Sequence, residues 1–371
     1  MLEAEEYRHK EKAPKQREHR FIFLDGLRGI AAMIVGALHA TQIFKLDYIP
    51  KHASLAVDFF FCLSGFIVAT AYDKKLTSGM RLSDFVMRRL IRLYPMILVA
   101  VMLGGALSIG QAFVAPTGTL KQVILLTASA LFLLPLGLAY GLEAYPVNNP
   151  IWSVFFEIFI NVIYGVFGNR ITKSVSRYAV ALLAVMLVAV IFISTGIDQV
   201  GFASYRNFAF GFVRVAYPFL VGMVIYREFW NKFTLRTSTW MGAGIAAALC
   251  LMLLDWHLPP SPVYDSICIV FLIPLIIVLG STVSASSRHV SKLLSWLGAI
   301  SYPFYLVHQP MLRLFRHASE RSGHFAGHGA LVAIFSLLTS AVLAQVLLKG
   351  YDTPVRSWLG RRVQSAPYSK A

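Results

Sequence analysis

The first apolar stretch of the sequence carries two ionisable side chains, Arg28 and His39, eleven residues apart. Eleven residues make about three turns of an α-helix, so both side chains would share one face, about 16 Å apart. Ionisable groups at membrane depth are costly and usually line a cavity or a pathway. The spacing therefore indicates a cation and a proton acceptor along one path. The alternative is an interfacial pair of Asp25 with Arg28 and an isolated core histidine.

Two carboxylates lie in other apolar stretches. Asp58 begins the second stretch, at about the depth of His39. There it could fix the tautomer of an imidazole and stabilise its charged form, as a histidine base requires; it could instead be the N-cap of its helix. Glu157 lies two turns into the fifth stretch, with no basic residue nearby in sequence. It needs a partner or a wet cavity.

Aromatic and hydroxyl side chains accompany these groups. Trp152 and Ser153 open the helix that carries Glu157, and Trp152 suits an interfacial aromatic belt. Pro303 and Pro310, in the tenth stretch, would break the hydrogen-bond ladder and could expose backbone carbonyls to a cavity. Aromatic packing beside a proline kink would explain the same pattern. Three residues of this stretch recur at every third position and could share a face: Tyr302, Tyr305 and His308.

An arginine cluster lies in the amphipathic residues 81–95, between the second and third apolar stretches. Arg81, Arg88 and Arg92 fall on one helical stripe, with Arg89 beside it. Such a cluster can bind anionic lipid headgroups. It suits a phosphorylated cofactor equally well, because a guanidinium group binds phosphate through two hydrogen bonds.

The elements that must position these residues are membrane helices, each of which needs roughly 20 apolar residues. The chain has no internal repeat and no loop long enough for a soluble domain. The sequence therefore predicts one all-α, polytopic transmembrane bundle. Candidate runs occur at residues 21–44, 54–72, 94–114, 120–140, 150–168, 178–197, 207–226, 237–254, 264–280, 293–315 and 329–348.

The positions of lysine and arginine predict the orientation of the bundle. Residues 1–20 and residues 73–93 carry six of them each, so both segments are expected in the cytoplasm. If residues 120–140 do not cross, the later basic loops also become cytoplasmic, and Pro135 with nearby glycines makes that run a re-entrant or surface element. We expect ten spans with both ends of the chain in the cytoplasm.

Composition excludes several classes of protein. The chain of 371 residues is 57% hydrophobic and 14% charged, yet its net charge is +16, unlike a soluble domain. A nucleic-acid-binding protein would need its basic residues on a soluble module, so no nucleic-acid partner is expected.

The three cysteines have no CxxC or Cys/His spacing, and we expect neither a disulfide framework nor a metal site.

The predicted domain organisation follows the same charge pattern. Residues 1–20 would be a polar cytoplasmic tail, 21–354 a membrane domain and 355–371 a basic cytoplasmic tail, with no appended soluble domain. No small-residue cleavage site closes the first apolar stretch, so it is read as a retained span and not as a signal peptide.

Taken in order, these segments resemble the acyltransferase-3 family of integral membrane acyltransferases, which includes O-antigen, exopolysaccharide and nodulation-factor O-acetyltransferases. The matches extend from residue 21 to about 354, and their order is more specific than any single motif. They are FLDGLRGIAA at 23–32 followed by His39, VDFFFCLSGF at 57–66, RLIRLYP at 89–95, WSVFFE at 152–157 and SYPFYLVHQP at 301–310.

The resemblance implies a cytoplasmic acyl-CoA donor, usually acetyl-CoA, and a sugar or glycan hydroxyl as acceptor, with no bound cofactor. It implies that Arg89 and Arg92, supported by Arg88, hold the CoA phosphates, while Arg28 steers the pantetheine arm or the thioester. His39, oriented by Asp58, would act as base or carry the acyl group. The acceptor side would be formed by Trp152, Ser153, Glu157, Tyr302, Tyr305 and His308.

The expected protein is thus a multi-pass bacterial cytoplasmic-membrane enzyme whose partners are acyl-CoA, a glycan acceptor and the lipid bilayer. Its acceptor, acyl chain length and oligomeric state are not encoded in any motif. Three alternatives compete with this interpretation: a transporter or flippase for a lipid-linked sugar, an enzyme that acylates a non-glycan small molecule, and an inactive scaffold.

Overall fold

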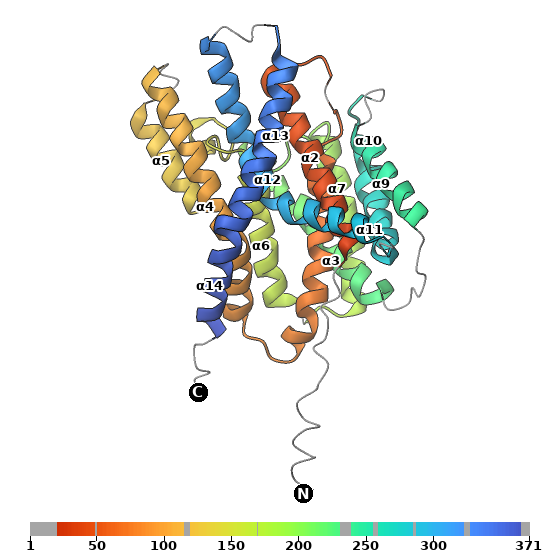
Figure 1. Cartoon of the computed structure of the whole chain (residues 1–371). Coiled ribbons are helices and arrows are strands. Elements are labelled where there is room, and N and C mark those ends of the chain that lie inside the picture. Colours follow the sequence, from red (N-terminus) through yellow and green to blue (C-terminus); the bar gives the residue numbers. More distant parts are fainter. Residues whose placement is uncertain are drawn as a thin grey trace, which may run out of the picture.

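The computed structural model describes residues 21–48, 50–114, 119–168, 170–230, 239–254, 259–284, 287–322 and 327–364. Every element in this part of the chain is a helix (Figure 1). The longer helices are α2 (Ile22–Phe44), α3 (Leu55–Thr77), α4 (Leu82–Val114), α6 (Ile151–Phe167), α7 (Lys173–Ile193), α8 (Tyr205–Val224), α9 (Thr239–Leu254), α12 (Arg288–Ser322) and α13 (Gly329–Leu347). The shorter ones are α5 (Leu120–Leu131), α10 (Pro262–Ile267), α11 (Ile273–Thr282) and α14 (Thr353–Gln364).

Among the described residues, seven helices are long and apolar enough to cross a membrane. They are α2, α3, α4, α7, α8 with the π-helical turn that follows it, α10 with α11, and α13 with α14. The helices α5, α6 and α9 are apolar but shorter. The prediction of an all-helical fold is therefore confirmed for the described residues, and seven of their helices are candidate membrane spans.

The structure adds detail to two predicted segments. In the run 120–140, which was expected not to cross, α5 ends at Leu131 after 12 residues and a 3-10 helix follows over Leu136–Tyr140. The chain after residue 354 is helical, because α13, a π-helical turn (Leu348–Asp352) and α14 follow one another without a break. Residues 1–20 and 365–371, the remainder of the expected tails, lie outside the described residues.

Small residues allow the central helices to approach closely, as is usual where helices pack in membranes. Gly26 and Gly29 of α2 lie against Leu294 and Leu297 of α12. Gly65 of α3 lies against the backbone of α8 in the same way. Helix α2 therefore packs closely on α12, and α3 packs closely on α8.

Helix α12 runs through both of its prolines and changes direction along its length (Figure 1). Pro310 has no N–H, so the carbonyl of Leu306 lacks its usual helical donor. The side-chain Nδ2 of Asn148, in the loop before α6, donates to that oxygen at 2.9 Å. The expectation of a freed carbonyl is therefore correct, but its partner is a protein side chain.

We expect Gly65→Ala to destabilise the protein by about 1–3 kcal/mol, the cost of overpacking a core. A methyl group on Gly65 would overlap the carbonyl oxygen of Phe219, a backbone atom that moves only if α3 and α8 separate. Gly110→Ala is the matched control, because Gly110 is also helical and has open space where the methyl group would go. Thermal unfolding of the purified variants measures both effects, and equal stability would contradict the close-packing role of Gly65.

Candidate functional site

A cavity of about 100 Å³ lies between α2, α3, α4, α6 and α12. A polar cavity needs roughly 10–15 Å³ for each water it holds, so this one has room for several waters or a small group. It brings together seven of the residues that the sequence predicted, from four segments: Arg28, Arg89, Arg92, Ser153, Glu157, Tyr302 and Tyr305.

Glu157 has the partner that its depth requires. Its Oε1 accepts hydrogen bonds from Arg89 NH2 at 3.0 Å and from Ser64 Oγ at 3.1 Å. Arg89 is only 6% exposed, and its Nε has no hydrogen-bond partner in the structure. Arg89, which was expected on the donor side, and Glu157, which was expected on the acceptor side, therefore form one ion pair in the cavity wall.

Arg28 is fixed by both α2 and α12. Its NH2 lies 3.1 Å from Asp25 Oδ1, so the i,i+3 pair anticipated as an alternative is present. The same nitrogen donates to the carbonyl of Gly298 at 2.7 Å, and Nε donates to Ser301 Oγ at 2.9 Å. These bonds hold the guanidinium in one position at the cavity wall.

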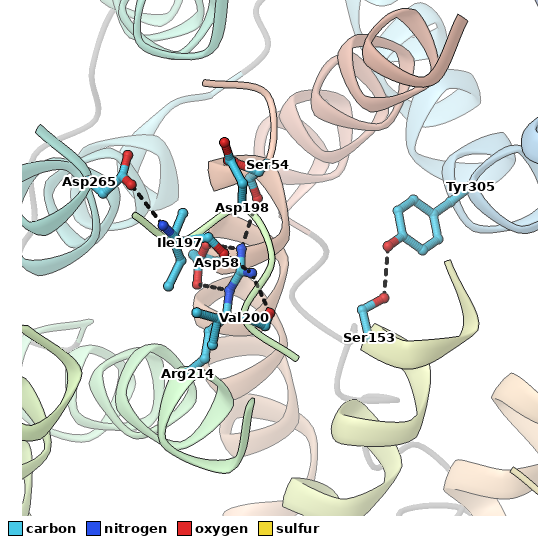
Figure 2. A network of polar contacts seen from close by, with 9 residues as sticks. All are labelled: Ser54, Asp58, Ser153, Ile197, Asp198, Val200, Arg214, Asp265 and Tyr305. Atoms are coloured by element: carbon cyan, nitrogen blue, oxygen red, sulfur yellow. Dashed lines mark hydrogen bonds and ion pairs between the residues drawn. The ribbon is translucent and has the colours of Figure 1, made fainter. Parts of the chain in front are cut away.

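The hydroxyl groups of the cavity are also held in place. Tyr302 donates to the carbonyl of Leu93 in α4 at 2.8 Å. Ser153 Oγ donates to the carbonyl of Pro150 at 3.0 Å and lies 2.8 Å from the Tyr305 hydroxyl (Figure 2). Because the single Ser153 proton is used, Tyr305 is the donor between these two residues.

His39 packs against His308, with ring centroids 5.3 Å apart. Arg28 and His39 therefore both contact α12, but only Arg28 is among the residues that line the cavity. His308 is fully buried, and its Nδ1 lies 3.1 Å from the carbonyl of Phe304. A carbonyl oxygen only accepts, so Nδ1 carries the proton and Nε2 has a free lone pair. That Nε2 is buried, and no described residue forms a hydrogen bond with it.

The predicted contact between Asp58 and His39 is not among those of the described residues, and the carboxylate has a different role (Figure 2). Both of its oxygens bind Arg214 of α8, at 3.1 Å to Nε and 2.8 Å to NH2. Both side chains are fully buried. In the described part of the chain, the side-chain partner of the Asp58 carboxylate is therefore Arg214 and not His39.

Trp152 belongs to the same structural unit and does not line the cavity. Its ring covers the guanidinium of Arg214, with the carbon CZ 5.1 Å from the ring centroid, a cation–π contact. Arg214 also donates to the carbonyls of Ile197 and Val200 (Figure 2). Trp152 and Asp58 therefore anchor the loop before α8 through Arg214. The sequence predicted this role for neither residue.

A second hollow, a groove of about 410 Å³, adjoins the cavity. Arg88 and Arg92 of α4 line it, together with Arg356 of α14. Arg92 lines both the groove and the cavity. The arginine cluster thus divides into Arg89, in the interior, and Arg88 with Arg92, at the groove.

Sequence reasoning missed two arginines, Arg214 and Arg356. Arg214 is a charge within an apolar stretch, which was the available signal, but its partner is 156 residues away. Arg356 lay in the segment read as a tail. In the described part of the chain, no three His, Cys, Asp or Glu side chains gather as a metal site would require.

The fold and the site together define a helical integral membrane protein with an arginine- and glutamate-lined cavity at its centre. The family model for the acyltransferase-3 domain matches residues 21–348. The chain belongs to the acyltransferase-3 family.

Two curated relatives are consistent with that membership. Acyltransferase MdmB of Streptomyces mycarofaciens is 26% identical over 93% of this chain and 94% of its own length. Protein 2 in the picA locus of Rhizobium radiobacter is 36% identical over 45% of this chain and 93% of its own length. No solved structure matches the chain.

Proposed function

We propose that this protein is a cytoplasmic-membrane O-acyltransferase with ten membrane crossings and both ends in the cytoplasm. It moves an acyl group, acetyl by preference, from cytoplasmic acyl-CoA to a hydroxyl of a sugar or glycan. The position of Arg92 carries this proposal, because Arg92 lines both the basic groove and the inner cavity. One ligand can therefore have phosphates in the groove and a reactive end in the protein interior.

The donor contacts divide along that path. Arg88 and Arg92 hold the phosphates of acyl-CoA, since guanidinium groups bind phosphate through two hydrogen bonds. The pantetheine arm enters the cavity past Arg92. Arg28, fixed by Asp25, Gly298 and Ser301, directs N–H groups at the thioester carbonyl and stabilises the developing oxyanion.

The reaction forms a carbon–oxygen ester bond and breaks the carbon–sulfur bond of the thioester. His39 takes the proton of the acceptor hydroxyl, the oxygen attacks the acyl carbon, and the CoA thiolate leaves and receives the proton. In the relay form of the mechanism, His39 attacks first and carries the acyl group to the acceptor. His308, in ring contact with His39, offers the free Nε2 that a second proton acceptor needs.

Three residues of the cavity wall serve the acceptor: Glu157, Tyr302 and Tyr305. Tyr305 is held by Ser153 and Tyr302 by the Leu93 carbonyl, so their rings present a fixed wall beside Glu157. Trp152 and Asp58 act indirectly, through Arg214. The acyltransferase name of the relative that matches nearly the whole chain supports group transfer over transport.

We expect purified protein to release free CoA from acetyl-CoA over many turnovers only when an acceptor hydroxyl is present. A thiol reagent measures the release, and the acylated glycan is identified by mass spectrometry of cells with and without the gene. A transporter or flippase would consume no thioester, and an inactive scaffold would not either. An acylated small molecule in place of a glycan would correct the acceptor class alone.

A further inference from the structure

Two helices far apart in sequence line the basic groove. Arg88 and Arg92 of α4 form one wall, and Thr353, Arg356, Ser357 and Gly360 of α14 form the other. The spacing of the α14 residues, three, four and seven after Thr353, places them on one helical face. Figure 1 shows α14 running beside the first part of α4. Helix α14 follows the residues matched by the family, 21–348.

The groove attracts anions. It has three guanidinium groups on its walls and no acidic side chain among the described residues that line it. Thr353 and Ser357 add hydroxyl donors, and Gly360 has open space at its Cα, so no side chain narrows that end. Arginines and hydroxyls that converge in this way suit phosphate oxygens.

Arg356 has a support that holds it in place. Asp352, the last residue of the π-helical turn, is 1% exposed, and its Oδ2 accepts from Arg356 NH1 at 2.9 Å. A guanidinium has five N–H donors, so this bond fixes the side chain and leaves donors for a ligand. The π-helical turn therefore supplies the residue that fixes Arg356. Such π-bulges occur frequently at functional sites.

We propose that α14 is the second half of the donor site and that Arg356 binds a phosphate at the nucleotide end of the acyl donor. This inference rests on the proposed acyl-CoA donor. Arg92 lines both the cavity and the groove, whereas Arg356 lines the groove alone. A donor whose thioester arm passes Arg92 into the cavity therefore has its nucleotide end at Arg356.

The expected result for Arg356→Ala is a KM for acetyl-CoA about tenfold higher with kcat unchanged, the scale of one hydrogen bond to a charged group. Its dissociation constant for free CoA rises by the same factor. With a pantetheine thioester that lacks the nucleotide, the variant and the parent protein have equal rates. Arg356→Lys keeps the positive charge but lacks the planar guanidinium, so its KM for acetyl-CoA should lie between those of the parent protein and Arg356→Ala.

Matched variants separate binding from folding. Arg361→Ala removes an exposed arginine of the same helix that does not line the groove, and it should leave KM unchanged. Asp352→Asn/Arg356→Gln removes both charges together, so no buried carboxylate is left unpaired. Ser357→Ala leaves the ion pair intact and should raise KM by a smaller factor.

Three outcomes overturn the inference. Parental affinity of Arg356→Ala for free CoA excludes a contact with the nucleotide end. An equal loss with the truncated thioester shows a general distortion of the site. A KM effect in bilayers with anionic lipid that disappears in phosphatidylcholine bilayers identifies a lipid headgroup as the phosphate source. If the parent protein binds CoA but transfers no acyl group, only the proposed function fails.

Discussion

His39→Ala is expected to lower acyl transfer by about 10²–10⁴-fold, the range for loss of a general base. The protein should still insert and unfold at the parental temperature, because the His39 ring is only half-buried and packs against the His308 ring. Acylation of the native acceptor, measured by mass spectrometry, gives the size of the loss. His317→Ala is the matched control. This histidine is half exposed and lies further along the same helix, α12, than His308.

The variant His308→Ala distinguishes between the two histidines. Its ring supports the His39 ring, and its Nε2 is the buried lone pair without a partner. A partial loss in His308→Ala with a near-complete loss in His39→Ala assigns the proton transfer to His39. Full acylation by His39→Ala together with loss in His308→Ala would reject the role of His39 and move the base to His308.

A single-turnover measurement separates the base from the acyl relay. If His39 carries the acyl group, enzyme mixed with acetyl-CoA and no acceptor releases about one equivalent of CoA in a burst. If His39 is only a base, no CoA appears before the acceptor hydroxyl arrives. A burst that is present in the parent protein and absent from His39→Ala would tie the acyl group to this residue.

The interior polar residues were predictable from sequence because burial of a charge in an apolar run is itself a signal. Four of the residues singled out from the sequence line one cavity: Arg28, Glu157, Tyr302 and Tyr305. The partners were harder to predict. Glu157 pairs with Arg89 across 68 residues, and no periodicity within one helix encodes a contact between two helices.

Asp58 is the clearest example of that limit. The sequence indicated only His39 as a partner for its carboxylate. A buried carboxylate gains most from a guanidinium that binds both oxygens, and the packing of α8 against α3 supplies one. The helical continuation of α13 into α14 was missed for a related reason, since its charges resemble those of a solvated tail.

We expect Asp58→Ala to destabilise the protein by about 3–5 kcal/mol, the cost of breaking a buried ion pair at one partner. The change leaves Arg214, fully buried, with a charge that three backbone carbonyls only partly compensate. Asp58→Asn should cost less, because an amide oxygen still accepts one of the two hydrogen bonds. The yield of monodisperse protein and its unfolding temperature measure both effects.

The same variants test what kind of residue Asp58 is. If it only anchors the loop before α8, the molecules of Asp58→Asn that remain folded transfer acyl groups at close to the parental rate. If it orients His39, the rate per folded molecule falls by an order of magnitude or more while stability changes little. Trp152→Phe adds a matched comparison, because it weakens the cover over Arg214 without touching the carboxylate. A stable but inactive Asp58→Asn beside an active Trp152→Phe would contradict the anchoring role, since both changes act on one guanidinium.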